Sequence, residues 1–184
     1  MSEICEICDK SDNTVKCVHC GVSVHRDCYG YPLVKLSKTK KWTCLVCGFP
    51  KDFKTKNEQF KCALCPNRKG AMKKATDWRW VHLRCALWIP EAFFYSTEGR
   101  EPIDLLRIPP KRFSEKCSYC KKGGDGACLS CSTQNCKMKF HVPCGINKNV
   151  FLTYRSNKKS QIDEIFSYCH LHSEYWRNKA SNAV

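Results

Sequence analysis

No stretch of this chain approaches the roughly 20 consecutive apolar residues that a membrane span needs. The pattern of apolar and polar positions predicts sparse secondary structure. We expect two short strands and three short helices, at Thr14–Lys16, Lys139–His141, Val81–Leu87, His141–Ile146 and Ser173–Lys179. The helix at Val81–Leu87 would carry His82 and Cys85 on one face. Four prolines predict that residues 86–116 run extended and irregular.

Cysteine and histidine stand out along the chain, with 17 Cys and 6 His in 184 residues. Twenty of these residues form ten pairs, and in nine pairs a two-residue gap lets both side chains reach one tetrahedral ion. In chain order the pairs are Cys5/Cys8, Cys17/Cys20, His25/Cys28, Cys44/Cys47, Cys62/Cys65, His82/Cys85, Cys117/Cys120, Cys131/Cys136, His141/Cys144 and Cys169/His172. They fill five four-ligand zinc sites, which predicts five Zn²⁺ ions and several small metal-centred cores.

A secreted disulfide scaffold is the alternative interpretation of so many cysteines. Three observations oppose it: no apolar leader follows Met1, histidines hold fixed places among the pairs, and the cysteine count is odd. Zinc therefore explains the pattern better than disulfides do. It places the chain in a reducing compartment, cytosolic or nuclear.

The charge of the chain suggests a polyanionic partner. The formal net charge is +15, and ionised thiols in five zinc sites would lower it to about +9. The distribution is uneven. Residues 1–12 hold four acidic residues and one lysine, whereas residues 105–159 are rich in Lys and Arg. One end suits a cationic ligand and the other an anionic one, although a mixed solubilising surface is the better explanation of any single lysine.

Residues 5–47 run Cys pair, Cys pair, His–Cys pair, Cys pair. In a cross-brace, pairs one and three share one ion, as do pairs two and four. The ligands are then Cys5, Cys8, His25 and Cys28 for one ion, and Cys17, Cys20, Cys44 and Cys47 for the other. This order resembles a PHD finger. The alternative is a RING finger, whose histidine comes one pair position earlier. Trp42, two residues before Cys44, favours the PHD finger.

The segments WRWVHLRCALWIPEAFF, EPID, IPPKRF, GACLSC and KFHVPCG extend the likeness. They resemble the PHD finger–zinc knuckle–extended PHD finger (PZP) module of BRPF- and JADE-type scaffold subunits of histone acetyltransferase complexes, over about residues 3–173. The resemblance implies small zinc-stabilised α+β modules with little regular structure, packed as one unit. Its divisions are a PHD finger at 1–50, a linker at 51–61, a knuckle at 62–90, a connecting segment at 91–116, an extended PHD finger at 117–173 and a tail at 174–184.

The resemblance also assigns the remaining ligands. The knuckle set is Cys62, Cys65, His82 and Cys85, and the extended finger's sets are Cys117, Cys120, His141 and Cys144, and Cys131, Cys136, Cys169 and His172. Three candidates are left over. We interpret Cys128 as a small buried residue. His170 adjoins Cys169, too close to chelate the same ion well, so His172 is kept as the ligand, and His19 is expected to face solvent.

Catalysis is not expected from this chain. Four protein ligands at each ion indicate structural zinc, and the sequence contains no HExxH, no glycine-rich phosphate loop and no Ser-His-Asp pattern. A binding module is the favoured class. It would be a nuclear chromatin reader, by resemblance one that targets subunits of an acetyltransferase complex. The alternatives are an interaction scaffold that ignores histones and a module that binds DNA only.

PHD fingers commonly take the start of the histone H3 tail as an added strand. The receiving strand would lie near Asp12–Lys16, through Asp12, Asn13, Thr14, Val15 and Lys16. Glu3 stands where relatives that prefer unmodified lysine-4 place an acid, and Ser23 where trimethyl-lysine readers carry a tryptophan. Asp9 and Asp12 are candidates for the neighbouring tail arginine. Carbonyls near Pro32, Lys41 and Trp42 are candidates for the tail's amino group.

The basic end suggests sequence-independent contact with nucleosomal DNA, because no helix presents base-reading side chains in order. The candidate phosphate contacts are Lys73, Lys74, Lys111, Arg112, Lys121, Lys122, Lys137, Lys139, Lys158 and Lys159. The loop Leu33–Lys41 adds Lys35, Lys38, Lys40 and Lys41 as residues that could face DNA. Solvated lysines with no role in nucleic-acid binding are the alternative.

Overall fold

All the sheets in the described part of the chain are two-stranded antiparallel ribbons. The computed structural model describes residues 3–36, 41–49, 60–156 and 163–182. The strands are β1 Val15–Lys16, β2 Ser23–Val24, β3 Met72–Lys74, β4 Trp80–His82, β5 Phe93–Phe94, β6 Ile103–Asp104, β7 Leu129–Ser130, β8 Lys139–Phe140, β9 Phe151–Ser156 and β10 Asp163–Tyr168. The helices are α1 Arg26–Tyr29, α2 Leu45–Gly48, α3 Leu83–Trp88, α4 Pro110–Ser114, α5 Val142–Ile146 and α6 Ser173–Ser181. None of these helices has the length and apolar character to cross a membrane.

One local plan occurs three times along the chain. A two-stranded ribbon (β1/β2, β3/β4 or β7/β8) leads into a histidine with extended backbone that caps a short helix. The capping histidines are His25, His82 and His141, and the cysteines on the helices that follow are Cys28, Cys85 and Cys144. Each His–Cys pair therefore spans a junction between strand and helix.

The strand-to-helix junction corrects one predicted helix. Val81 and His82 belong to β4, and the helix begins only at Leu83. His82 and Cys85 thus do not share a helix face. The ring comes from the strand end and the thiol from the first helical turn. Residues 86–116 are also more ordered than the prolines predicted, because they contain the end of α3, the β5/β6 ribbon and α4.

The other predicted elements are confirmed within a residue or two. The strand expected at Thr14–Lys16 is β1, and the one at Lys139–His141 is β8. The helices expected at His141–Ile146 and Ser173–Lys179 are α5 and α6. The longest ribbon, β9/β10, was not predicted. It pairs Phe151 with Tyr168 and Ser156 with Asp163.

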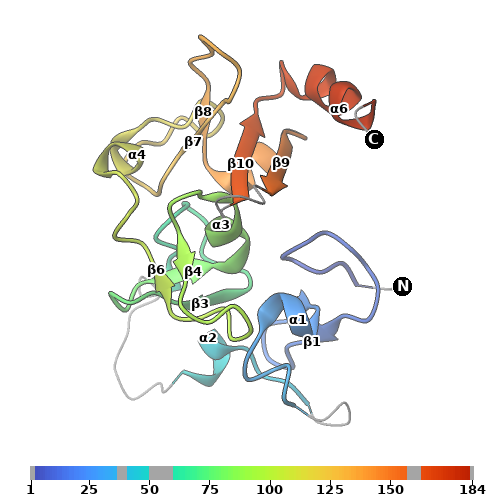
Figure 1. Ribbon diagram of the computed structural model, residues 1–184. Helices are drawn as coiled ribbons and strands as arrows, with labels where there is room; N and C mark the ends of the chain where they lie inside the picture. Colours follow the sequence, from blue (N-terminus) through green and yellow to red (C-terminus); the bar gives the residue numbers. More distant parts are fainter. Residues whose placement is uncertain (1–2, 37–40, 50–59, 157–162, 183–184) are drawn as a thin grey trace.

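The middle segment of the chain lies between the two outer fingers. Figure 1 shows the green knuckle ribbon and α3 between the blue first finger and the orange-red last finger. On the first side, the ring of Trp80 from β4 packs 5.6 Å from that of Phe49, which follows α2. On the other side α3 contacts α5. The three zinc-binding parts are therefore packed as one unit.

At two glycines the backbone of a finger runs close to the backbone of a neighbouring segment. Gly30 has φ +74°, and a Cβ there would lie 2.4 Å from the carbonyl oxygen of Glu98. Gly126 has φ +128°, and a Cβ there would lie 2.5 Å from the backbone nitrogen of Cys65. Both positions need a residue without a side chain. The first finger therefore packs closely against the connecting segment, and the extended finger against the knuckle.

The buried side chains form one continuous core that runs from Cys5 to Cys169. Thiols of the metal sites alternate in it with apolar residues such as Leu64, Val81 and Ile103. The expectation of several small separate cores is therefore only partly right. Each metal site is local, but the apolar packing between the sites is shared.

Candidate zinc centres and recognition face

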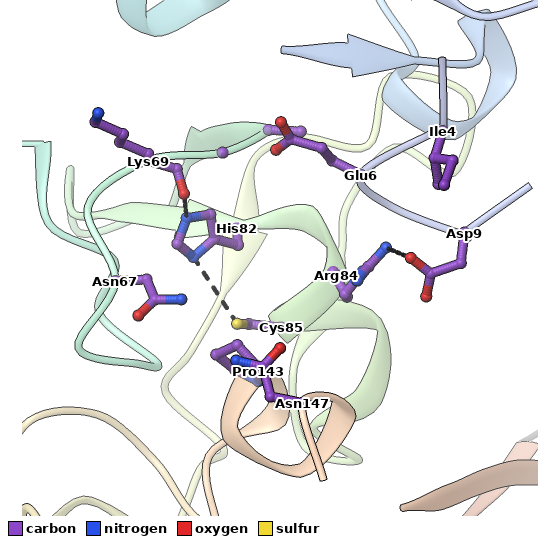
Figure 2. A pocket seen from close by; sticks show the side chains of 12 residues that line it. Ile4, Glu6, Asp9, Asn67, Lys69, His82, Arg84, Cys85, Pro143 and Asn147 are labelled. Carbon is purple, nitrogen blue, oxygen red and sulfur yellow. Dashed lines mark hydrogen bonds and ion pairs between the residues drawn. The ribbon is translucent and has the colours of Figure 1, made fainter. Parts of the chain in front are cut away.

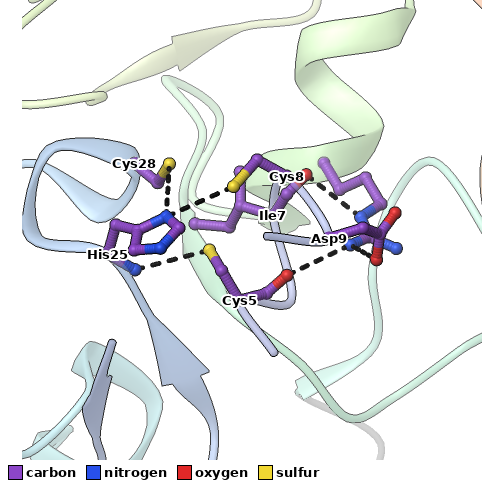
Figure 3. Close-up of polar contacts among 7 residues, drawn as sticks. Cys5, Ile7, Cys8, Asp9, His25 and Cys28 are labelled. Atoms are coloured by element: carbon purple, nitrogen blue, oxygen red, sulfur yellow. Dashed lines mark hydrogen bonds and ion pairs between the residues drawn. The ribbon is translucent and has the colours of Figure 1, made fainter. Parts of the chain in front are cut away.

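The first finger holds two quartets of metal-binding side chains. In one, Nδ1 of His25 lies 3.2 Å from Sγ of Cys8 and 3.6 Å from Sγ of Cys28, and the His25 N–H donates to Sγ of Cys5 (3.4 Å) (Figure 3). The other quartet is Cys17, Cys20, Cys44 and Cys47. These are the two sets that the cross-brace predicted.

The knuckle quartet, Cys62, Cys65, His82 and Cys85, is buried at all four positions. Nε2 of His82 lies 2.8 Å from the carbonyl oxygen of Lys69 (Figure 2). A carbonyl oxygen only accepts, so Nε2 carries the proton and Nδ1 is left free for a metal. Nδ1 indeed faces the thiols, 3.3 Å from Sγ of Cys65.

The extended finger brings its two predicted quartets together as well. They are Cys117, Cys120, His141 and Cys144, and Cys131, Cys136, Cys169 and His172. In the second, Nδ1 of His172 lies 3.3 Å from Sγ of Cys169 and 3.5 Å from Sγ of Cys131. His172, and not His170, therefore completes this set.

The distances inside the quartets fit tetrahedral zinc. Bonds of about 2.3 Å to sulfur and about 2.0 Å to nitrogen place two sulfurs about 3.8 Å apart, and a sulfur and a nitrogen about 3.5 Å apart. The Sγ–Sγ distances are 3.7 Å for Cys20–Cys44 and 3.9 Å for Cys136–Cys169. Four protein ligands close each site, so these ions would build the fold and leave no position open for a substrate.

In each quartet the first cysteine along the chain has a lowered pKa. Burial raises these pKa values, but hydrogen bonds to the sulfur outweigh it. Backbone N–H donors lower the pKa of Cys17 and of Cys131 to about 6. At Cys62 the neighbouring thiols and His82 act in the same direction. Each site therefore offers one thiol that ionises readily, the form that binds zinc.

Cys128 lies outside every quartet and is fully buried. Its Sγ donates to the carbonyl oxygen of Glu115 at 3.7 Å. Burial, with the charges of Cys117 and Glu115, raises the pKa of this thiol to about 12. Cys128 is therefore a neutral packing residue. His19 and His170 are exposed, and Nδ1 of His170 lies 3.1 Å from the hydroxyl of Tyr119.

Glu3 lies on the β1/β2 ribbon of the first finger. Its carboxylate accepts from Nζ of Lys16 and from Oγ of Ser23. Its backbone carbonyl accepts from Oγ1 of Thr14 at 3.0 Å. The hydrogen bonds to Lys16 and Ser23 lower the pKa of Glu3. The predicted lysine acceptor is thus a charged group already placed beside the predicted receiving strand.

The outer edge of β1 follows from the hydrogen bonds next to it. Cys17 N–H donates to Val22 on the β2 side, and Val18 N–H donates to Trp42 on the other side. Because N–H directions alternate along a strand, the main-chain groups of Lys16 point away from β2. Lys16 therefore offers its N–H and C=O groups on the outer side of β1, whereas those of Val15 point toward β2.

The other residues predicted to contact the histone tail differ in how free they are to do so. Asp9 is ion-paired with Arg84 at 2.6 Å, and an exposed Asp12 lies 3.7 Å from Nε2 of His25. The exposed Asn13 has φ +49° in the turn before β1. The Trp42 carbonyl already accepts from Val18 (3.0 Å). The exposed Pro32 and Lys41 are then the better candidates for the tail's amino group.

Comparison with known families matches residues 60–172 to the family described as "PHD-zinc-finger like domain" and residues 11–48 to "PHD-finger". The chain belongs to the PHD-zinc-finger-like family. The match to the first of these covers both the knuckle and the extended-finger quartets.

Relatives and a solved structure extend the likeness over nearly the whole PHD-zinc-finger-like chain. It is 36% identical to the Drosophila melanogaster "Bromodomain-containing protein homolog" over 90% of this chain and 12% of that protein. It is 36% identical to Xenopus laevis "Protein Jade-1" over 92% of this chain and 20% of that protein. The chain thus spans a fifth or less of these relatives. The zebrafish "PHF14-PZP" crystal structure has TM-score 0.71 and 28% identity, over 96% of this chain and 91% of that one. The chain is a PZP module.

Four of the residues predicted to contact DNA bond to, or pack against, other residues of this PHD-zinc-finger-like chain. Lys73 is fully buried, and its Nζ donates to the carbonyl oxygens of Tyr31 and Gly99. Nζ of Lys74 lies over the ring of Trp80, at 4.3 Å. The other two form ion pairs, Arg112 with Glu91 and Lys139 with Glu115. Lys73 is a correction, because its charge is buried inside the molecule instead of facing solvent. Arg112 is also a correction, because its guanidinium bonds to Glu91 and to the carbonyl oxygen of Cys128.

Lys111, Lys121, Lys122 and Lys137 are exposed, as a phosphate contact requires. Lys158 and Lys159, with Lys38 and Lys40 of the loop, lie outside the described residues. Lys35 is exposed, with its Nζ 4.6 Å from the centre of the Tyr31 ring.

The residues that join the first finger to the knuckle were not predicted from the sequence. Arg84 donates to the carbonyl oxygens of Cys5 and Ile7. It also pairs with Asp9 (Figure 2). It thereby fixes the first zinc loop from outside the finger. A cleft of about 310 Å³ lies beside it, where residues of all three fingers meet. An arginine between the ligands His82 and Cys85 is visible in the sequence. The sequence does not indicate, however, that its partners lie more than 70 residues away.

Proposed function

We propose that the module is a nuclear chromatin reader whose first finger binds the amino-terminal tail of histone H3 when lysine-4 is unmodified. The observation that carries the proposal is the position of Glu3, a fixed carboxylate on the ribbon whose β1 edge points outward. An extended peptide can add to such an edge as a third strand. Its main chain would bond to β1, and a lysine on the Glu3 face would reach the carboxylate.

The chemistry of Glu3 suits an ammonium group that still has hydrogens. An unmodified lysine donates charge-assisted hydrogen bonds to a carboxylate, whereas trimethyl-lysine has no N–H to donate. Readers of trimethyl-lysine use aromatic rings. Here Ser23 is buried in β2 and donates to Glu3, where the tryptophan of such a reader would stand. The face therefore favours the unmodified tail.

The test is calorimetry with tail peptides unmodified or trimethylated at lysine-4. We expect the unmodified peptide to bind, and Glu3→Gln to weaken it by roughly five-fold, a modest effect because the carboxylate is exposed. Asp27→Asn is the matched control, since it removes an exposed acid of the same finger that does not contact Lys16 or Ser23. Equal binding of both peptides, or of neither, would favour an interaction scaffold that ignores histones.

We propose in addition that the basic surface of the connecting segment and the extended finger contacts nucleosomal DNA without sequence preference. The support is the positive net charge, formally +15 and about +9 with five zinc sites filled, together with four exposed lysines: Lys111, Lys121, Lys122 and Lys137. Two modest affinities on one rigid unit would reinforce each other through effective concentration. By its likeness to the scaffold subunits of acetyltransferase complexes, the module would bring such a complex to chromatin.

A salt titration of duplex binding tests the DNA contact. Four phosphate contacts predict a slope of roughly −4 for log affinity against log salt. Lys122→Gln should reduce the slope by about 1, whereas Lys10→Gln, an exposed lysine of the acidic amino-terminal segment, should leave it unchanged. A slope near zero would show that the module does not bind DNA through phosphate contacts, and would overturn this part of the proposal. Strong duplex binding with no response to tail peptides would instead identify a module that binds DNA only.

A further inference from the structure

Glu3 is held at three points by one face of the β1/β2 ribbon. Lys16 and Ser23 are directly opposite each other in the register, so their side chains leave the ribbon on the same side. Thr14, two residues before Lys16, is on that side too. Ser23 and Lys16 donate to the two carboxylate oxygens, one each, and Thr14 to the backbone carbonyl. Each oxygen of the carboxylate therefore already has a donor within the chain.

We propose that Lys16 is an internal competitor for the tail lysine, so that its ammonium sets both the affinity and the methyl-lysine selectivity of the first finger. This inference rests on the proposed binding of the H3 tail at Glu3. Nζ of Lys16 bonds to Oε1 of Glu3, while Oε2 bonds to Ser23. An incoming ammonium must therefore displace Lys16 or share Oε1 with it.

The position of Lys16 strengthens the competition. It belongs to the strand that would receive the tail, so a tail lysine reaching for Glu3 would lie near a like charge on the same face. The ion pair is also easy to open. The side chain of Lys16 is 56% exposed and that of Glu3 41%. Lys16 would therefore weaken tail binding without preventing it.

Ser23 has a different part in the same arrangement. It is buried, and its hydroxyl fixes the direction of the Glu3 carboxylate without carrying charge. Ser23 is therefore a positioning residue, and Lys16 is the group that must move. Removing the charge of Lys16 would free one oxygen of an acceptor that Ser23 and Thr14 still hold in place. Only a ligand with an N–H to donate gains from that oxygen, so selectivity against trimethyl-lysine should rise together with affinity.

Calorimetry on the zinc-loaded module with Lys16→Met tests the competition. We expect the peptide unmodified at lysine-4 to bind about two- to five-fold more tightly, and the trimethylated peptide to change little. Lys10→Met is the matched control, because it removes the same charge from an exposed lysine of the same finger that does not bond to the Glu3 carboxylate. In a Glu3→Gln background the effect of Lys16→Met should disappear, as a double-mutant cycle requires for coupled residues.

The results separate this inference from the function on which it rests. If the wild-type module binds neither peptide, the proposed tail recognition fails. If the wild type discriminates between the peptides but Lys16→Met is unchanged or weaker, the reader stands and the competition is overturned. The competition is also overturned if Lys10→Met and Lys16→Met strengthen binding equally, since the effect would then be one of net charge alone.

Discussion

The Cys62→Ser variant is expected to lose the knuckle zinc and, with it, the cooperative fold of the whole module. Cys62 is buried and belongs to a quartet that is buried at every position, between the two outer fingers. A structural zinc contributes about 10–16 kcal/mol in small finger peptides, comparable with or larger than the net stability of about 5–15 kcal/mol of a typical domain. Loss of this ion should therefore unfold more than the knuckle.

The measurement is zinc per chain by elemental analysis, together with thermal unfolding followed by circular dichroism. The wild type should hold five ions, and Cys62→Ser four or fewer with no sharp unfolding transition. Cys128→Ser is the matched control, a buried cysteine outside every quartet, and it should keep all five. Five ions in Cys62→Ser would refute the ligand assignment, and four in Cys128→Ser would make Cys128 a ligand.

The Lys73→Met variant is expected to lower the free energy of unfolding by about 3–5 kcal/mol, the cost of removing one partner from a buried charged network. The ammonium of Lys73 donates to the carbonyls of Tyr31 and Gly99, lies 3.4 Å from a carboxylate oxygen of Glu101 and sits over the ring of Tyr29. Burial lowers the pKa of Lys73, although Glu101 opposes the shift. Methionine fills the space but leaves the carbonyls without a donor.

Denaturant unfolding gives the stability, and Lys122→Met is the control. Lys122 is exposed, so its replacement should change the free energy of unfolding by no more than about 0.5 kcal/mol. In DNA binding the two variants should behave the opposite way. At a temperature where it is still folded, Lys73→Met should keep the wild-type salt slope, whereas the loss of Lys122 should reduce it. A stable Lys73→Met protein with a reduced salt slope would show that Lys73 contacts DNA after all.

The metal sites were predictable because zinc imposes its own geometry on the sequence. The two-residue gap between ligands is a local requirement, so the pairs could be found without knowing the fold. Which pairs share an ion came from the resemblance to PHD fingers, and the quartets brought together by the structure agree. The helix at Val81–Leu87 was wrong because both a helix and a strand-to-helix junction can bring His82 and Cys85 to one ion.

Charged residues were less predictable because their roles depend on partners far along the chain. Lys73 and Lys74 are adjacent in the sequence, yet one is fully buried at a junction of fingers and the other lies over an aromatic ring. Glu3 lies beside β1, and its part in binding the tail lysine stays a prediction. Its bonds to Lys16 and Ser23 depend on the register of β1 with β2, which no short motif indicates.

The bonds of Arg84 and Lys73 to the first finger have a consequence for truncated proteins. A fragment that ends at residue 50 would keep eight zinc ligands but lose both of these cations. The backbone oxygens of Cys5, Ile7 and Tyr31 would then accept hydrogen bonds from water instead. The loop next to Glu3 would be freer to move. Affinities measured on such a fragment would describe a looser receptor than the one that works in the intact chain.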